Sequence, residues 1–288
     1  MKKETIIKYV LFVCMLVLVI LVVQKKNKRL ILDVRYRDEP PTGNVLVYDV
    51  VLHVATEHDL IIPLHVTVKH DQTYLLNGYE EIVMNEESQR VYYAFSLLTN
   101  LSNHLPKGAR TYVPRSTKLL GYQKNGKYLT LNVSRDFYHY LKTHERELLS
   151  IISHTFKETL GVEYIRILVE GQPIRYADYE YVWMYYQDFV LNAMNHPSLE
   201  RTQLVIYYFT PVEDTFYLVP VTYFVTESED VRTLIDYYLM QPSSLPVLSF
   251  PDDQELIDRQ YRLTLMANRL ISEDDSYRRF NEYQITLY

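Results

Sequence analysis

The chain repeats one of its own segments. When the sequence is shifted by 157 residues, residues 47–68 fall on residues 204–225 without a gap. Each segment holds two runs of strong β-forming residues separated by a short polar stretch, which is the pattern of a β-hairpin. We therefore expect two copies of one folded unit, and only a fold that can occur twice is compatible with the chain.

Both predicted hairpins carry a proline in the second strand. Pro63 lies in "LIIPLHVTV" and Pro220 in "YLVPVTYFV", each at the fourth position. Proline has no N–H group, so in a sheet it is confined to an edge, to the start of a strand or to a bulge. Apolar residues alternate around each proline, which predicts one buried face. We therefore expect the same edge or bulge to be built twice.

A helix is predicted after each hairpin. Apolar residues at helical spacing mark residues 87–101 in the first copy and residues 228–240 in the second. Thr226, followed three residues later by Glu229, has the pattern of a capping box for the second helix. The two copies thus share the order strand, strand, helix.

The sequence "LTL" occurs in both copies and predicts a further strand in each, over residues 127–134 and 261–268. The first copy continues with a predicted helix over residues 143–161 and a strand over residues 162–174. Too few residues remain for these two elements in the second copy. We expect that copy to be shortened or degenerate, with residues 283–288 as a vestigial last strand.

These patterns predict an α+β fold of two small sheet-plus-helix modules. Between the modules, a tyrosine-rich segment has apolar residues at helical spacing and is expected to form an aromatic connecting helix. The expected divisions are a basic tail with a transmembrane anchor at 1–29, a linker at 30–44, the first module at 45–176, the connecting helix at 177–202 and the second module at 203–288.

Residues 9–23 form an apolar run with lysines on both sides. With its apolar neighbours the run reaches roughly 18 residues, and a bilayer requires about 17–25. No small residues follow the run for a signal peptidase, and Val13 before Cys14 does not fit a lipoprotein signal. We expect an uncleaved single-pass signal anchor in the cell membrane.

The orientation of this anchor has two interpretations. Basic residues after the apolar run favour a cytoplasmic body by the positive-inside rule, whereas a short basic tail before an apolar run is typical of an export signal. We expect the body of the protein to lie outside the cytoplasm.

The net charge argues against nucleic acid as a partner, and the cysteine content argues against disulfides and thiolate metal sites in the body of the protein. Residues 30–288 carry a net charge of −12, because seven of the 30 basic residues but only one of the 36 acidic residues precede them. An acidic body repels phosphate backbones, so nucleic acid is not an expected partner. Cys14 is the only cysteine, so the body can form neither a disulfide nor a thiolate metal site.

Histidines and aspartates surround the first hairpin, and His53 and His65 can approach each other across it. Histidine and carboxylate clusters bind metals. However, the ungapped match replaces His53 by Thr210 and His65 by Thr222 in the second copy, so the fold does not depend on them. We expect no metal and no cofactor in this group, whose members are His53, His58, Asp59, His65, His70 and Asp71.

No catalytic residues are expected either. Ser153 and His154 are adjacent on a predicted helix and cannot face each other, so together with Asp136 they do not form a hydrolytic triad. No glycine-rich phosphate-binding motif is present. Carboxylate pairs arise by chance among 36 acidic residues and do not indicate a glycosidase.

Tyrosine is the unusual part of the composition, with 28 residues. Its ring offers a large contact area with a polar end, and it is enriched at protein interfaces. The same rings also fill small cores that are poor in glycine. Both interpretations stay open, with core packing favoured because several tyrosines fall at predicted buried positions.

Two segments, "LPKGARTYVPRSTKLLGYQKNGKYLTLNVSRDFY" and "GVEYIRILVEGQPI", resemble the GerMN domain of the spore-germination GerM family. Residues 105–108 fit its Leu-Pro-x-Gly turn, residues 129–134 its middle strand and residues 165–173 its last strand. "YLVPVTYFV" fits its early strand. The resemblance covers residues 45–175 well and residues 203–270 in part.

The resemblance implies tandem modules of a ring-building type in a membrane-attached, extracytoplasmic protein that is not an enzyme. It also implies a role in sporulation or in another cell-envelope assembly. The chain departs from the family in two respects. It lacks the lipoprotein signal that family members commonly carry, and its second copy is shortened, so the two modules are not expected to dock in the same way.

Together, these observations predict a structural or interaction protein that binds envelope proteins or itself through strand edges and helix faces. The alternative is an extracytoplasmic ligand-binding module that holds cell-wall glycan on tyrosine-rich surfaces. An enzyme is the least supported class.

Overall fold

A computed structural model describes the protein over ten stretches of the chain. They are residues 45–71, 86–100, 102–176, 179–180, 182–195, 201–212, 215–226, 230–240, 253–272 and 280–287. The predicted membrane anchor and the linker after it lie outside these residues. No helix within the described stretches is long and apolar enough to cross a bilayer.

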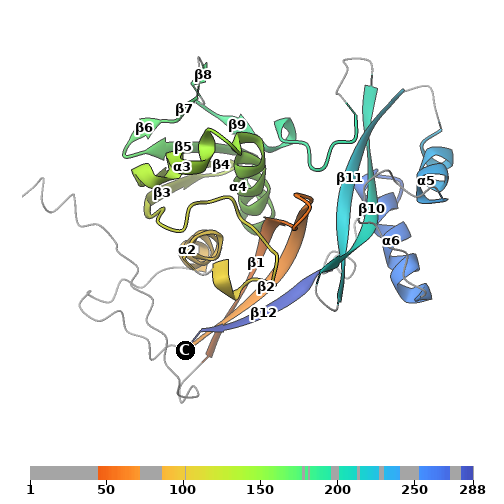
Figure 1. Ribbon diagram of the computed structural model, residues 1–288, viewed down its shortest axis with the longest axis horizontal. Coiled ribbons are helices and arrows are strands. Elements are labelled where there is room, and N and C mark those ends of the chain that lie inside the picture. The colour runs from red at the N-terminus through yellow and green to blue at the C-terminus, as the bar shows by residue number, and fades with distance from the viewer. Residues whose placement is uncertain are drawn as a thin grey trace, which may run out of the picture. The chain divides into compact units, whose positions relative to one another are not determined.

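The two predicted hairpins are present and both are antiparallel (Figure 1). Their strands are β1 (Val45–Ala55), β2 (Ile61–Asp71), β10 (Arg201–Val212) and β11 (Thr215–Thr226). In β2 the buried face carries Ile62, Leu64 and Val66, as the alternation predicts. The proline of each hairpin lies on the opposite face of its strand, and both prolines are buried as well. In β11 both faces are buried, since Leu218, Thr222 and Phe224 lie on the same side as Pro220.

The ungapped match between the hairpins is wrong before the turn. Val66 pairs with Val50, whereas Tyr223, its counterpart 157 residues later, pairs with Leu204. The first strands therefore correspond at a distance of 154 residues and the second strands at 157, so the second hairpin has three more residues between equivalent positions. Because side chains alternate between faces, the ungapped match is off by an odd number and places the buried residues of the first strand on the wrong face.

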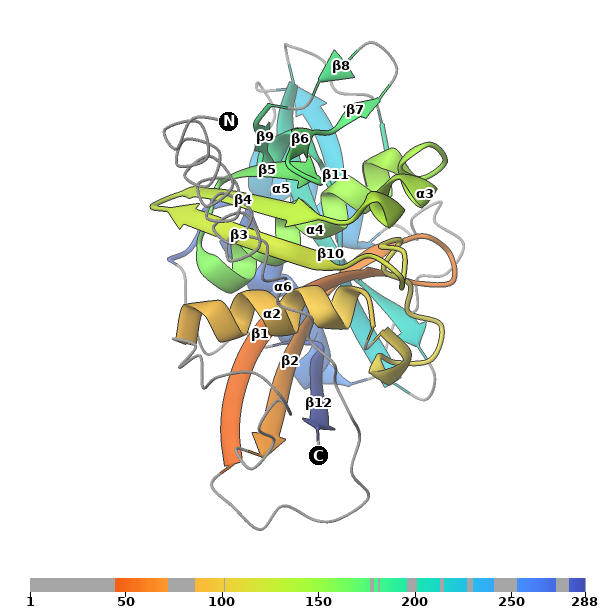
Figure 2. The same ribbon diagram turned by 90° about the vertical axis from the view of Figure 1, so that its left-hand side faces the viewer.

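The first module adds a second sheet and several helices (Figure 2). Its strands are β3 (Leu119–Asn125), β4 (Tyr128–Val133), β5 (Tyr164–Val169), β6 (Gln172–Pro173) and β9 (Met184–Tyr185). Its helices are α2 (Glu86–Leu98), η1 (Ser102–His104), η2 (Arg135–Phe137), α3 (Tyr138–Leu141) and α4 (Glu145–Leu160). Helix α4 ends at Gly161, whose φ of 68° is the left-handed conformation that glycine adopts without strain.

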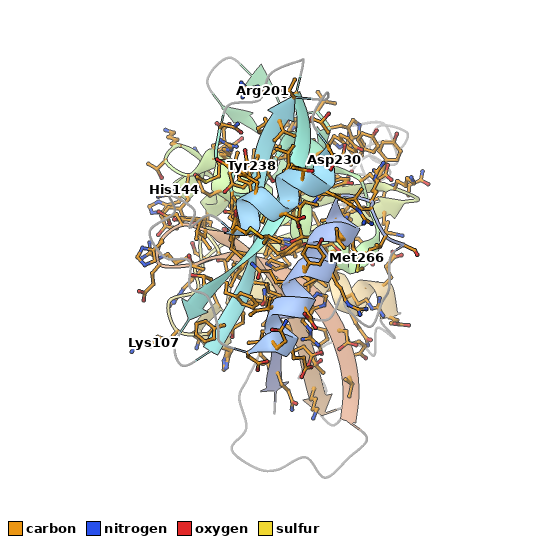
Figure 3. The ribbon with its side chains drawn as sticks, turned by 90° about the vertical axis from the view of Figure 1, so that its right-hand side faces the viewer. Lys107, His144, Arg201, Asp230, Tyr238 and Met266 are labelled. Atoms are coloured by element: carbon orange, nitrogen blue, oxygen red, sulfur yellow. The ribbon has the colours of Figure 1, made fainter. Side chains whose placement is uncertain are left out.

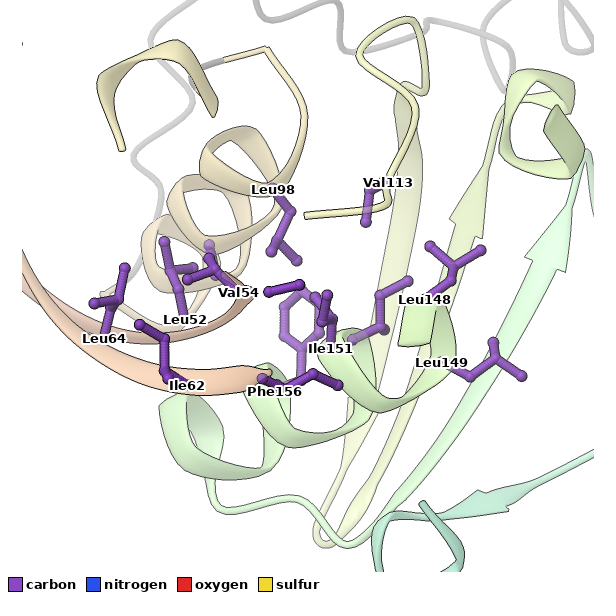
Figure 4. Packing of buried hydrophobic residues seen from close by; sticks show 14 of the residues in the cluster. Leu52, Val54, Ile62, Leu64, Leu98, Val113, Leu148, Leu149, Ile151 and Phe156 are labelled. Atoms are coloured by element: carbon purple, nitrogen blue, oxygen red, sulfur yellow. The ribbon is translucent and has the colours of Figure 1, made fainter. Parts of the chain in front are cut away.

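Helix α4 lies between the first hairpin and the second sheet (Figure 4). One side carries Phe156 and Ile151, and the side with Leu148 and Leu149 faces the strands of the sheet. All four side chains are fully buried. The helix is therefore covered by β structure on two sides and forms the centre of the core.

The predicted connecting helix at 177–202 is wrong. Its described residues instead form β8 (Tyr179–Glu180), which pairs with β7 (Arg175–Tyr176), then β9 and the short 3₁₀ helix η3 (Tyr186–Asp188). Strand β9 pairs with the free side of β5. Tyrosine, tryptophan and valine favour extended backbone, and the open edge of β5 offers a partner that the helical spacing does not reveal.

The second module contains α5 (Val231–Met240) and α6 (Gln254–Ala267), which lie together on one side of the second hairpin (Figure 3). The strand predicted at 261–268 is wrong, because nearly all of it belongs to α6. Asp253 caps this helix by accepting the N–H of Glu255 at 2.9 Å.

The start of α5 also differs from the prediction. The carboxylate of Asp230 accepts the N–H of Thr233 at 3.0 Å and so caps this helix. The hydroxyl of Thr233 donates to the same carboxylate at 2.7 Å, and this bond, followed by the N–H bond, lowers the pKa of Asp230. Of the predicted capping box, Glu229 lies outside the described residues.

The last described strand, β12 (Glu282–Leu287), does not join the second hairpin. It pairs in parallel with β2, which gives the first hairpin a three-stranded sheet of order β1-β2-β12. The predicted last strand at 283–288 therefore exists but completes the sheet of the other copy.

Candidate interaction surfaces

The outer strand of the first hairpin has its edge occupied by side chains of α4. Thr155 Oγ1 accepts the N–H of His53 at 2.8 Å. Thr159 Oγ1 accepts the N–H of Val51 at 3.1 Å and donates to its carbonyl at 3.0 Å. Backbone groups at the edge of β1 are thus satisfied by a helix rather than by another strand.

Helix α6 repeats this arrangement on β10. Thr264 Oγ1 accepts the N–H of Tyr207 at 3.2 Å, and Asn268 bonds both the N–H and the carbonyl of Val205 at 3.0 and 2.6 Å. Tyr207 and Val205 correspond to His53 and Val51 at the 154-residue distance. Helix α6 is therefore the structural counterpart of α4, and docking through the edges of β1 and β10 is excluded at these positions.

The two hairpins are joined by two asparagines, of which Asn281 is the first. Its side-chain N–H group donates to the carbonyl of Pro63 at 2.7 Å, and its own carbonyl accepts the N–H of His65 at 3.0 Å. The same side chain bonds both the N–H and the carbonyl of Leu218, at 2.7 and 2.8 Å. Asn281 thus ties β2 of one hairpin to β11 of the other.

Asn192 makes the same bonds in the opposite direction. It donates to the carbonyl of Pro220 at 2.7 Å and accepts the N–H of Thr222 at 3.3 Å. Its side chain bonds the N–H and the carbonyl of Ile61 at 2.8 and 2.7 Å. Both asparagines have positive φ, 47° for Asn192 and 56° for Asn281, a conformation that asparagine tolerates better than most residues.

This reciprocal joint accounts for the repeated proline. In a strand, the N–H and C=O of one residue point to the same side, so an N–H at residue 63 or 220 would point toward the donating amide of an asparagine. Two donors would then face each other. Proline removes one of them, and the position is the site of an inter-hairpin joint rather than a bulge.

The predicted histidine and aspartate group does not form a metal site in the described residues, where no three His, Cys, Asp or Glu side chains gather. His53 is buried beside His154, with ring centroids 5.3 Å apart, and His65 lies against Phe280. Asp59 accepts a hydrogen bond from the hydroxyl of Tyr112. The corrected register also makes Tyr207, not Thr210, the counterpart of His53.

Two of the three residues considered for hydrolysis form hydrogen bonds with other parts of the fold. His154 Nε2 lies 2.7 Å from the carbonyl of Phe189, and Ser153 Oγ is buried without a hydrogen-bond partner. Asp136 accepts a bond from Ser134 at 3.3 Å. Burial lowers the pKa of His154 to about 4 and lowers that of His53 as well, so both rings are neutral at pH 7.

Several tyrosines form an exposed row on the face of the second sheet that α4 does not cover. Tyr128 stacks on Tyr164 with centroids 4.8 Å apart, and Tyr164 stacks on Tyr185 at 5.0 Å. Trp183 meets the edge of Tyr128, and Arg166 lies 4.8 Å from the Trp183 ring. We call these five residues the outer sheet face.

The outer sheet face is open to solvent but offers few free ring faces. Tyr128 is 46% and Trp183 40% exposed. Rings that stack on each other present their edges and hydroxyls outward, whereas a sugar ring packs on an open aromatic face. The arrangement therefore suits contact with a protein surface better than a row of sugar rings.

Comparison with known proteins supports the assignment of the fold. The sequence profile of the Germane family, described as "Sporulation and spore germination", matches residues 70–175. This match confirms the resemblance to the GerMN domain over these residues. No curated protein matches the chain.

Solved structures provide the second comparison. The tandem GerMN domains of the sporulation protein GerM from Bacillus subtilis match with a TM-score of 0.54 at 19% identity, over 73% of this chain and 72% of that one. This likeness shows a shared tandem fold. The first GerMN domain of the same protein matches with a TM-score of 0.33 at 15% identity, over 45% of this chain and 86% of that one. A putative lipoprotein from Clostridium perfringens matches with a TM-score of 0.29 at 15% identity, over 53% and 95%.

Proposed function

We propose that this chain, which contains a Germane domain in a tandem GerMN fold, is a membrane-anchored extracytoplasmic interaction protein of a sporulation or cell-envelope assembly. The observation that carries the proposal is the use made of its polar side chains. Thr155, Thr159, His154 and the two joint asparagines, Asn192 and Asn281, all bind backbone groups of the fold itself. Such a construction serves to hold two modules together and to present their outer surfaces.

Docking is proposed to use the faces of helices and sheets. The edges of β1 and β10 are occupied by α4 and α6, so strand addition at these edges would require the helices to leave. Exposed apolar and aromatic side chains remain on both modules, among them Trp183 and Tyr237. These are the side-chain types that contribute most to protein interfaces.

Membrane attachment rests on the apolar run at residues 9–23. The test is a full-length chain with a reporter at its C-terminus that is active only outside the cytoplasm. We expect the reporter to be active and protease added to spheroplasts to digest the body. An inactive reporter together with full protection of the body would overturn the proposed location.

The interaction role is tested in the same cells by photo-crosslinking. A photoreactive residue replaces Trp183 or Tyr237 in the full chain, and the products are identified by mass spectrometry. We expect products that contain envelope proteins or a second copy of the chain. The exposed Tyr140 serves as a matched control, and equal yields from all three positions would contradict the proposal.

Glycan binding is a second candidate, favoured by the exposure of Tyr128 and Trp183. The chain contains a single tryptophan, so its fluorescence reports on this surface alone. Titration with soluble cell-wall fragments should leave the emission of Trp183 unchanged if the surface binds protein. A saturable change that Tyr128→Ala abolishes would favour the glycan.

A further inference from the structure

Helices α4 and α6 are structurally equivalent, but one side that is buried in α4 is exposed in α6. Thr264 and Asn268 of the second module take the places of Thr155 and Thr159. The two helices therefore correspond at a distance of 109 residues, and equivalent positions of each helix face the first strand of its hairpin. Four positions on one side of α4 are fully buried. They are Leu148, Leu149, Ile152 and Ser153.

Their counterparts on α6 are all exposed, and they are Ile257, Asp258, Tyr261 and Arg262. Ile257 is 39% and Tyr261 37% exposed. In the first module, Leu148 and Leu149 on the corresponding side of α4 face the second sheet (Figure 4). The side of α6 that lies open is thus the side built to meet a sheet.

The second module has a shorter segment between its two helices than the first module has. In the first module, residues 99–144 connect α2 to α4 and contain β3 and β4, and β5 follows α4. In the second, the shorter segment 241–253 connects α5 to α6, and the strand after α6, β12, pairs with β2 instead. Among the described residues, no sheet of the second module covers this side of α6.

The open side continues onto α5. The hydroxyl of Tyr261 donates to Asp236 at 3.3 Å, and next to Asp236 lie two exposed side chains, Tyr237 at 52% and Met240 at 83%. Both helices face the viewer in Figure 3. We call this surface the α5–α6 face, made of Tyr237, Met240, Ile257, Asp258, Tyr261 and Arg262.

The same chain carries a sheet with one face that no described helix covers. The outer sheet face of β4, β5 and β9 has no helix over it among the described residues, while α4 covers the reverse side. Its one cation, Arg166, has a buried Nε without a hydrogen-bond partner. The α5–α6 face carries Asp258 and Arg262, and Asp236 lies beside it, so its carboxylates outnumber its cation by one. The two surfaces are therefore opposite in charge as well as complementary in layer type.

We propose that the α5–α6 face of one copy binds the outer sheet face of a second copy. This inference rests on the proposed interaction role and specifies its partner. The two surfaces differ, so the contact is heterologous, and each bound copy leaves one free surface of each kind for the next. Copies then associate head to tail, into a ring or an open row.

The test measures the mass of the full chain in detergent by light scattering. We expect the wild-type mass to rise with concentration to at least twice the 34.4 kDa of one chain. Ile257→Glu and Tyr128→Glu each remove one of the two surfaces and should each give a monomer. An equal mixture of the two variants should give a dimer that does not grow, because one intact surface of each kind remains.

Two controls keep the result specific. Tyr140→Glu changes an equally exposed tyrosine outside both surfaces and should associate as the wild type does. Asp258→Arg, at an exposed helix position, repeats the test if Ile257→Glu lowers the melting temperature. A wild type that is monomeric at every concentration, or a mixture that stays monomeric, would overturn the head-to-tail contact. The topology and crosslinking results would stand apart from that outcome.

Discussion

At the scale of single residues, the joint depends on two asparagines that no local pattern marks. Asn281 and Asn192 each satisfy backbone groups of both hairpins while holding a positive φ. Asparagine fits this position because its short side chain carries both a donor and an acceptor and because it tolerates the left-handed backbone. Other residue types lose either the hydrogen bonds or the backbone conformation.

Replacing Asn281 by alanine should therefore lower the free energy of unfolding by about 2–4 kcal/mol, since partners in both hairpins lose their bonds and the left-handed backbone is strained. Urea denaturation of the full chain measures this loss. Asn281→Gly keeps the backbone conformation and should recover about 1 kcal/mol of it. A change below about 0.5 kcal/mol in both variants would mean that the joint contributes little to stability.

Buried neutral histidines make stability depend on pH. The pKa of His154 is about 4 in the folded chain, against about 6.5 when unfolded. Below about pH 6.5 this histidine is protonated in the unfolded state but stays neutral in the folded state. The free energy of unfolding therefore falls as the pH drops from about 6.5 to about 4, and His154 does not affect it above this window. Lys157 lowers the pKa further, whereas Glu158 and the carbonyl of Phe189 raise it.

The loss attributable to His154 should reach at most about 3 kcal/mol at pH 4. Thermal melts between pH 4 and 8 measure it. His154→Gln keeps a donor for the carbonyl of Phe189 and should flatten part of the slope, leaving the contribution of His53, whose pKa is lowered in the same direction. An unchanged slope in this variant would assign the pH dependence to other groups.

At the scale of elements, the helices replace neighbouring strands. Thr155 and Thr264 lie at equivalent places in α4 and α6 and accept a backbone N–H from the outer strand of each hairpin. Valine has the same shape as threonine but no acceptor, so Thr155→Val or Thr264→Val leaves a backbone donor unpaired.

Each valine variant should lose about 1–3 kcal/mol of unfolding free energy, measured by urea denaturation. Thr155→Ser and Thr264→Ser retain the hydroxyl and should lose distinctly less. If valine and serine variants are equally stable, the hydroxyls do not hold the strand edges, and these edges return as candidates for strand addition.

Elements whose apolar residues follow one local period in the sequence were predictable, even where both faces of the element are buried, as in β11. The alternation in β2 and β11, and the helical spacing in α2, α4 and α5, identify these elements from the sequence. The errors fall where a short apolar motif suits either structure. The motif Leu-Thr-Leu is a strand in β4 and part of a helix in α6, where Asp253 caps the start and Thr264 contacts β10.

At the scale of the whole molecule, the end of the chain completes the sheet at its beginning. Asn281 bonds Pro63 across 218 residues of sequence, and β12 follows it along β2. The described modules are therefore joined by exchanged segments, with residues 192–195 on β11 and β12 on β2.

Truncation after Phe280 should expose this dependence. Without Asn281 and β12, residues 65–70 lose a neighbouring strand, so the hydrogen exchange of the amide groups that bond to it should speed up by about tenfold or more. Exchange in β4 and β5 should change little, which provides the internal control. Equal acceleration in both sheets would indicate general destabilisation, and no acceleration in β2 would show that β12 is dispensable there.

The sequence by itself determined that one unit occurs twice and that each copy begins with a hairpin, because a repeat and a local period of apolar residues are visible in the sequence. Tertiary structure alone decided which partner each strand finds. Three features depend on contacts between residues far apart in the chain. They are the pairing of β12 with β2, the strand and hairpin joint formed by residues 182–195, and the structural equivalence of α4 and α6. Periodicity states which side of an element is buried, and it contains no information about what buries it.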